Sequence, residues 1–125
     1  MSARSLVVDD ILANRRLMQA KLEAKYYTVL LAENGVQALQ VAETEQPEII
    51  LLDVMMPGMD GPETFLALRK LPGLENTPAI FMTAKVMESE VARFKELGAL
   101  GVIPKPFDPM TLSEQIKSLW DENSG

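Results

Sequence analysis

Five side chains in this sequence have the types and positions needed for phosphoryl chemistry. Asp9 and Asp10 follow one short apolar run, Asp53 follows another, and Thr83 and Lys105 lie just past two more. A carboxylate can attack and take up a phosphoryl group, and carboxylate oxygens are ligands that suit Mg²⁺. An ammonium and a hydroxyl can bind the phosphoryl oxygens. These residue types suggest a magnesium-dependent phosphoryl acceptor, provided that the fold brings them together.

The composition excludes several other kinds of site. The 125 residues include no cysteine and no histidine, and 18 acidic residues outnumber 12 basic ones, which gives a net charge of −6. Disulfides, thiolate nucleophiles, sulfur-bound zinc and imidazole chemistry are therefore absent. The acidic balance argues against direct nucleic-acid binding. No apolar run approaches membrane-spanning length and no signal-peptide pattern begins the sequence, so we expect a cytoplasmic protein without membrane insertion.

Short apolar runs alternate five times with amphipathic stretches. The runs predict buried strands at residues 5–8, 28–32, 48–52, 79–82 and 101–103. Between and after them, apolar side chains recur at helical spacings of three and four residues. Asp108 and Pro109 predict the N-cap and first residue of the last helix, and Gly98 predicts the end of the helix before it.

This alternation predicts an α/β fold, a doubly wound five-stranded parallel sheet with five helices. We expect one domain over residues 1–121 and a loose tail over residues 122–125. Ligands of such folds bind at the carboxyl ends of the strands, where all the candidate side chains are expected to lie. Three carboxylates and one ammonium would give the site a charge of −2, which one Mg²⁺ would neutralise.

Each of these residues also has a simpler explanation when taken alone. Asp9 and Asp10 could begin a helix, and Asp53 could form a turn. Thr83 suits any strand end, and Lys105 could be a solvated lysine. Their joint position at strand ends on one edge favours the functional interpretation.

The segment from Ile50 to Gly61 resembles the phosphoacceptor segment of receiver domains in bacterial two-component response regulators. It reads Ile-Leu-Leu-Asp-Val-Met-Met-Pro-Gly-Met-Asp-Gly. The segments 6–10, 83–84 and 105–107 provide the family's other signatures in the same order, and the resemblance covers nearly the whole chain. It implies a flavodoxin-like strand order of 2-1-3-4-5. It also implies a phosphorylation-controlled switch in signal transduction, without a turnover substrate.

The resemblance further implies which residues accept the phosphoryl group and bind the metal. Asp53 would receive the group from a histidine kinase or a phosphotransfer protein. Asp10 and Asp53 would bind Mg²⁺ directly, Asp9 would act largely through water, and Met55 would contribute its main-chain carbonyl.

The resemblance assigns the read-out of phosphorylation to residues of the last two strands. Thr83 would bind a phosphoryl oxygen and Lys105 would pair with the phosphoryl group, next to a cis bond to Pro106. The fourth helix, fifth strand and fifth helix would then present a changed face to a downstream protein. Val102 stands where many members carry Tyr or Phe, so the aromatic read-out is missing. Pro104 removes an N–H, which is tolerable if its strand lies at an edge.

Met55 and Lys85 lie two residues after Asp53 and Thr83, respectively. They would flank the path of a hydrolytic water, which a methionine side chain cannot orient. We therefore expect a long-lived phosphoryl group on Asp53.

Other functions stay open at the level of sequence. The chain could be a receiver cut from a larger regulator with a DNA-binding or cyclase output. A magnesium-dependent aspartyl phosphohydrolase would share much of the chemistry, but it needs a second acid where Met55 stands. A flavin or nucleotide carrier would need a phosphate-binding loop after the first strand, where Asp9 and Asp10 stand instead.

Overall fold

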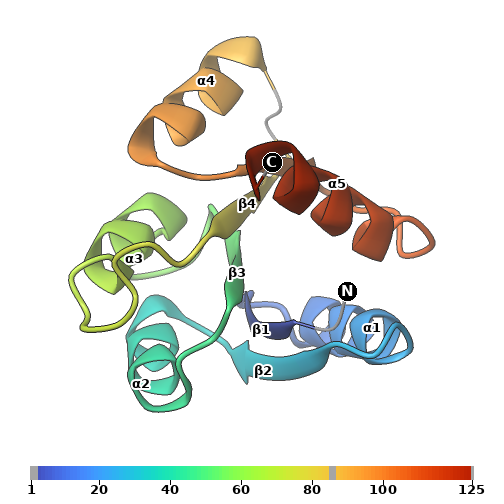
Figure 1. The fold of residues 1–125 in the computed structure, drawn as a ribbon, viewed down its shortest axis with the longest axis horizontal. Helices are drawn as coiled ribbons and strands as arrows, with labels where there is room; N and C mark the ends of the chain where they lie inside the picture. Colours follow the sequence, from blue (N-terminus) through green and yellow to red (C-terminus); the bar gives the residue numbers. More distant parts are fainter. Residues whose placement is uncertain (1–2, 85–86, 125) are drawn as a thin grey trace.

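Five parallel strands form a single sheet in the computed structural model, which describes residues 3–84 and 87–124 (Figure 1). The strands are β1 (Arg4–Val8), β2 (Thr28–Ala32), β3 (Ile49–Asp53), β4 (Ala79–Thr83) and β5 (Gly101–Pro104). Their order is β2-β1-β3-β4-β5, and every neighbouring pair is parallel. This confirms the predicted sheet and the strand order that the family resemblance implied.

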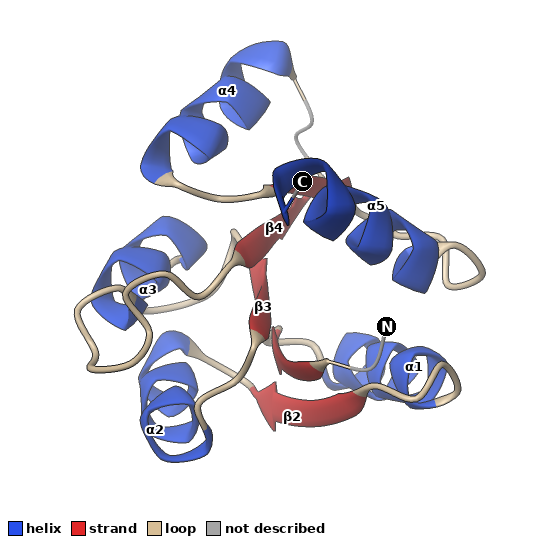
Figure 2. Cartoon of the chain, in the orientation of Figure 1, coloured by secondary structure: helices blue, strands red, loops and turns tan. Residues whose placement is uncertain are grey.

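Helices cover both faces of the sheet (Figure 2). They are α1 (Leu12–Glu23), α2 (Gly35–Glu45), α3 (Gly61–Leu68), α4 (Glu88–Leu97) and α5 (Leu112–Ser124). Helices α1 and α5 lie on one face, and α2, α3 and α4 lie on the other. The doubly wound arrangement is thus confirmed.

Side chains alternate between two hydrophobic cores along each central strand. In β1, Leu6 and Val8 belong to the core under α2, α3 and α4, whereas Val7 belongs to the core under α1 and α5. Every residue of β3 and β4 is buried, because both strands are central and covered on both faces. This explains why the sequence shows them as unbroken apolar runs.

The boundaries of the last helix differ from the prediction. Asp108 and Pro109 do not begin it, because the Asp108 side chain accepts a hydrogen bond from the Met110 N–H at 2.9 Å. The Asp108 carbonyl accepts another from the Thr111 N–H, and these two bonds close a turn before α5 begins at Leu112. At its other end α5 continues to Ser124, so residues 122–124 are helical where a loose tail was expected. Gly98 ends α4 as predicted, with φ of 112°.

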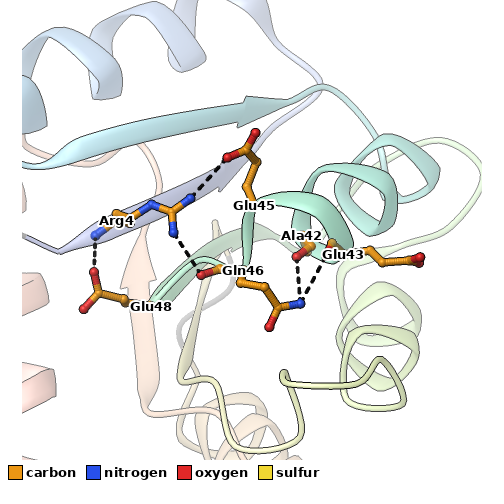
Figure 3. A network of polar contacts seen from close by, with 6 residues as sticks. All are labelled: Arg4, Ala42, Glu43, Glu45, Gln46 and Glu48. Atoms are coloured by element: carbon orange, nitrogen blue, oxygen red, sulfur yellow. Dashed lines mark hydrogen bonds and ion pairs between the residues drawn. The ribbon is translucent and has the colours of Figure 1, made fainter.

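A polar network around Arg4 joins three segments at the start of β1 (Figure 3). The Arg4 guanidinium contacts the Glu45 carboxylate at 3.2 Å. The main-chain N–H of Arg4 donates to the Glu48 carboxylate at 3.0 Å. Gln46, in the left-handed region with φ of 48°, ends α2 and donates from its side chain to the Pro72 carbonyl at 3.2 Å. These contacts anchor the amino edge of the sheet, opposite the edge where the candidate residues lie.

The turn that follows α1 contains a residue in a conformation unusual for its type. Tyr26 has φ of 70° although it is not glycine, and its side chain is 85% exposed. Its N–H donates to the Glu23 carbonyl and the Tyr27 N–H donates to the Leu22 carbonyl, which forms a Schellman motif. Leu22 and Tyr27 are both buried in the core under α1 and α5, as this motif favours.

We expect Tyr26→Gly to raise the free energy of unfolding by roughly 0.5–1 kcal/mol, because glycine adopts this conformation without a Cβ clash. Chemical denaturation followed by circular dichroism measures the change. Tyr26→Ala is the matched control, since it removes the ring but keeps the Cβ. Equal stabilities of the two variants would contradict the expectation.

Candidate functional site

The candidate side chains meet at the carboxyl edge of the sheet. Asp9 directly follows β1, Asp53 ends β3 and Thr83 ends β4, while Lys105 directly follows β5. Carboxylate oxygens of Asp9, Asp10 and Asp53 all lie within 4.8 Å of one another. The Lys105 Nζ lies 3.0 Å from Asp9 Oδ2 and 3.2 Å from Asp53 Oδ1. The predicted convergence of three carboxylates and one ammonium is therefore present.

Asp9 is held more tightly than the sequence indicated. Its side chain is fully buried, and its Oδ1 accepts a hydrogen bond from the Ile11 N–H at 2.9 Å. Its Oδ2 accepts one from the Asn14 side chain at 3.3 Å, and its carbonyl accepts one from Arg15 Nη1 at 2.7 Å. The N-cap of α1 is Ile11, so neither aspartate of the pair caps this helix.

Sequence reasoning missed Asn14 and Arg15. The one available signal was position, because both follow the acidic pair within the first turn of a predicted helix. Asparagine is a weak helix former, and its presence there indicates a role for its side chain.

Burial and the neighbouring charges together set the pKa values of Asp53 and Lys105. Burial raises the pKa of Asp53 to about 6, with Lys105 lowering it and the neighbouring Asp9 raising it. Burial alone would lower the pKa of Lys105, but the hydrogen bond to Asp9 and the charges of Asp53 and Asp9 hold it above its usual value. Lys105 therefore stays charged but does not fully compensate the carboxylates.

The donor set fits a hard divalent cation. All three acids offer oxygen, their ligand atoms are close together, and Asp10 is exposed where Asp9 and Asp53 are buried. A single ammonium against three carboxylates leaves negative charge that a cation of this kind would neutralise. Met55 lies in the loop after β3 with a side chain that is 70% exposed.

The remaining predicted residues flank this cluster. Thr83 is buried at the end of β4, and Val102 is half-buried in β5, packed against the core under α4. The Lys105–Pro106 bond is cis, as the resemblance implied. Pro104 pairs with Thr83 at the end of an edge strand, where its missing N–H is tolerated. Lys85 lies outside the described residues.

A cavity of about 650 Å³ opens beside the acidic cluster. Its lining includes Asp10, residues at and just before the start of α2 such as Gln37, and residues of the β3–α3 loop such as Met59. The exposed acid of the cluster is therefore accessible to a small molecule.

This fold and site define a class, the doubly wound α/β domains with a carboxylate cluster at the carboxyl edge of a parallel sheet. Residues 5–117 match the family described as "Response regulator receiver domain", and the chain belongs to this family. Among the described residues, no helix has both the length and the apolar character needed to cross a bilayer.

Relatives and solved structures extend the comparison. Response regulator PleD of Caulobacter vibrioides is 47% identical over 122 residues, which cover 95% of this chain but 26% of PleD. Sporulation initiation phosphotransferase F of Bacillus subtilis is 36% identical over 117 residues, 94% of this chain and 93% of that protein. The structure of chemotaxis response regulator CheY4 of Vibrio cholerae is similar with a TM-score of 0.89 and 31% identity, covering 95% of this chain and 99% of the other.

Family membership makes this chain a receiver domain of two-component signalling, a class of phosphorylation switches. The chain spans about a quarter of the length of PleD and nearly all of the sporulation phosphotransferase.

Proposed function

We propose that Asp53 is the phosphoacceptor and that Mg²⁺ is required for its phosphorylation. The observation that supports this most strongly is the position of Lys105 Nζ between the carboxylates of Asp9 and Asp53, with Asp10 beside them. The Lys105 ammonium, which contacts both buried acids, could pair with a phosphoryl group on Asp53 after the transfer. The class of function is thus a switch that carries its phosphoryl group covalently.

In the proposed reaction, a carboxylate oxygen of Asp53 attacks the phosphorus of the donor. The new O–P bond forms while the bond between phosphorus and the donor's leaving group breaks, and the leaving group keeps the electron pair. Asp10, Asp53 and the Met55 carbonyl would hold Mg²⁺, with Asp9 acting largely through water, and the cation would supply positive charge for the transferred oxygens. Lys105 then pairs with one phosphoryl oxygen.

The proposed phosphoryl donor is a histidine kinase or a phosphotransfer protein, as is usual for this family. The proposed site of action is the cytoplasm. This sequence contains no histidine, so it cannot hold the phosphohistidine itself. A small phosphodonor could reach the cluster through the cavity beside Asp10.

We further propose that the surface of α4, β5 and α5 changes on phosphorylation and binds a downstream protein. The support is positional: Thr83 ends β4 at the start of the connection to α4, and Lys105 follows β5 at the start of the connection to α5. A phosphoryl group near both adds up to two negative charges where β5 ends and where the connections to α4 and α5 start. With Val102 in place of an aromatic ring, the change would be carried by Thr83 and the backbone around it.

The proposed acceptor chemistry does not depend on which output domain or protein the receiver controls. Relatives include the Bacillus subtilis transcriptional regulatory protein PhoP, which is 39% identical over 119 residues and of which the chain spans 49%. A receiver within a larger regulator, with a DNA-binding or cyclase output, would use the same acceptor site.

The test of the proposal is incubation of the protein with acetyl phosphate and Mg²⁺, followed by intact mass measurement. We expect a gain of one phosphoryl group per chain, and no gain when EDTA removes the metal. Absence of any gain with Mg²⁺ present would contradict the proposed function. Repeated release of phosphate from many unrelated phosphate esters would indicate a phosphohydrolase instead.

The lifetime of the phosphoryl group is proposed to depend on Met55. Because its exposed side chain cannot orient water by hydrogen bonding, we expect Met55→Asn to shorten the half-life of phosphoryl-Asp53 roughly tenfold. Loss of label after removal of acetyl phosphate measures the half-life. Met110→Asn is the matched control, since Met110 is 75% exposed in a different loop. An unchanged half-life in Met55→Asn would contradict the role.

A further inference from the structure

Arg15 is buried to an unusual degree for an arginine. Its side chain is only 11% exposed, whereas its neighbour Arg16 in the same helix is exposed. Arginine is rarely this buried without specific partners, because removing its charge from water is costly. The contacts of Arg15 therefore indicate what it is for.

Those contacts join the end of β1 to the end of β2. Arg15 Nη1 donates to the Asp9 carbonyl at 2.7 Å, and Nη2 lies 3.7 Å from Glu33 Oε2, just past β2. The Asp9 N–H donates to the Ala32 carbonyl, the last residue of β2, at 3.2 Å. The main chain of Asp9 is thus held at two atoms: its N–H is bound by β2, and its carbonyl oxygen is bound by Arg15.

Holding the Asp9 carbonyl also orients Asp10. That carbonyl belongs to the planar peptide group that joins Asp9 to the Asp10 Cα, so fixing its oxygen fixes the plane from which the Asp10 side chain extends. Asp10 is the exposed member of the three carboxylates, so packing holds its side chain less than it holds those of Asp9 and Asp53. Asp9 and Asp53, by contrast, are buried and contact Lys105.

Among the described residues, Arg15 contacts the main-chain carbonyl of Asp9 and the Glu33 side chain but no carboxylate of the acidic cluster, so its effect on the cluster is chiefly geometric. We propose that Arg15 is a positioning residue, which fixes the Asp9–Asp10 peptide and so aligns Asp10 for binding of the divalent cation. This inference rests on the proposed function and adds a residue to it. Groups that hold metal ligands in place commonly affect metal affinity tenfold or more.

The test is titration of the full chain with Mg²⁺ by isothermal titration calorimetry. We expect Arg15→Ala to weaken binding roughly tenfold. The matched control is Arg16→Ala, which removes the same charge from the same helix and should change the dissociation constant less than about twofold. Arg15→Lys should be intermediate, because one ammonium cannot replace a guanidinium that contacts Asp9 and Glu33 through two nitrogens.

A second measurement separates positioning from general folding. The rate of phosphoryl uptake by Arg15→Ala should return to that of the wild type at saturating Mg²⁺, because the defect lies in affinity. Binding within twofold of wild type in folded Arg15→Ala would overturn the role of Arg15. If Arg15→Ala does not fold, Arg15→Lys decides: weaker binding at unchanged melting temperature supports the role, and equal binding overturns it. A wild-type protein that binds no Mg²⁺ would overturn the proposed function and this role together.

Discussion

Asp53→Asn is expected to abolish phosphoryl uptake from acetyl phosphate. The substitution keeps the size and shape of the side chain but replaces an anionic oxygen by an amide oxygen, which is a far weaker nucleophile. Asp53 is 4% exposed at the end of β3, and its Oδ1 lies 3.2 Å from Lys105 Nζ. Asp9 is not expected to take over, because it is already engaged by Lys105, Asn14 and the Ile11 N–H.

Intact mass measurement with Mg²⁺ present shows the result directly, and Asp60→Asn is the matched control. Asp60 lies in the loop after β3, seven residues from Asp53, and its replacement removes the same charge. Its side chain caps α3 by accepting from the Glu63 N–H at 2.9 Å, and asparagine caps about as well. We expect uptake by Asp60→Asn to equal that of the wild type. Equal uptake by Asp53→Asn would place the acceptor elsewhere.

The elements that could be predicted from the sequence are those whose pattern reports burial. Strands β3 and β4 are covered on both faces, so their sequences are continuous apolar runs with clear limits. The start of α5 could not be predicted in this way. An aspartate followed by proline is typical of a helix start, but it is equally suited to the turn that Asp108 forms here. The choice between them depends on where α5 packs.

The site likewise has a part that the sequence predicts and a part that only the packing of the helices determines. The meeting of Asp9, Asp53 and Lys105 follows from the topology alone, since parallel strand ends share one edge. The contacts of Arg15 do not, because they depend on how α1 is rotated against β1 and β2. On the sequence, Arg15 and Arg16 are equivalent neighbours, and only tertiary packing buries the first and exposes the second.

The acidic cluster also has an energetic consequence for the metal-free protein. Burial raises the pKa of Asp53 from its usual value of 3.8 to about 6. The folded protein therefore binds this proton more tightly than the unfolded chain. The stabilising contribution of the protonated carboxyl is present below about pH 4 and is lost as the pH rises through about 6. The raised pKa of Lys105 works in a different range, since its ammonium stabilises the fold until the pH exceeds its usual value near 10.5.

Asp53→Asn is accordingly expected to stabilise the protein in EDTA at pH 7.5, by roughly 1–3 kcal/mol. The amide that replaces the carboxyl cannot ionise, so the difference between variant and wild type should shrink steadily as the pH falls from 7 toward 4. Chemical denaturation at several pH values measures it, with Asp60→Asn as the control that should show no such trend. Saturating Mg²⁺ should close the gap by binding the folded wild type.

A wild-type protein at least as stable as Asp53→Asn at pH 7.5 without metal would contradict this expectation. The predicted outcome would show that one substitution removes phosphoryl uptake and raises stability. Side chains that serve only the fold do not behave in this way, because their removal weakens it. Opposite changes in uptake and stability would therefore mark Asp53 as a residue kept for its chemistry, and the cost of burying its charge beside Asp9 as what a bound cation would offset.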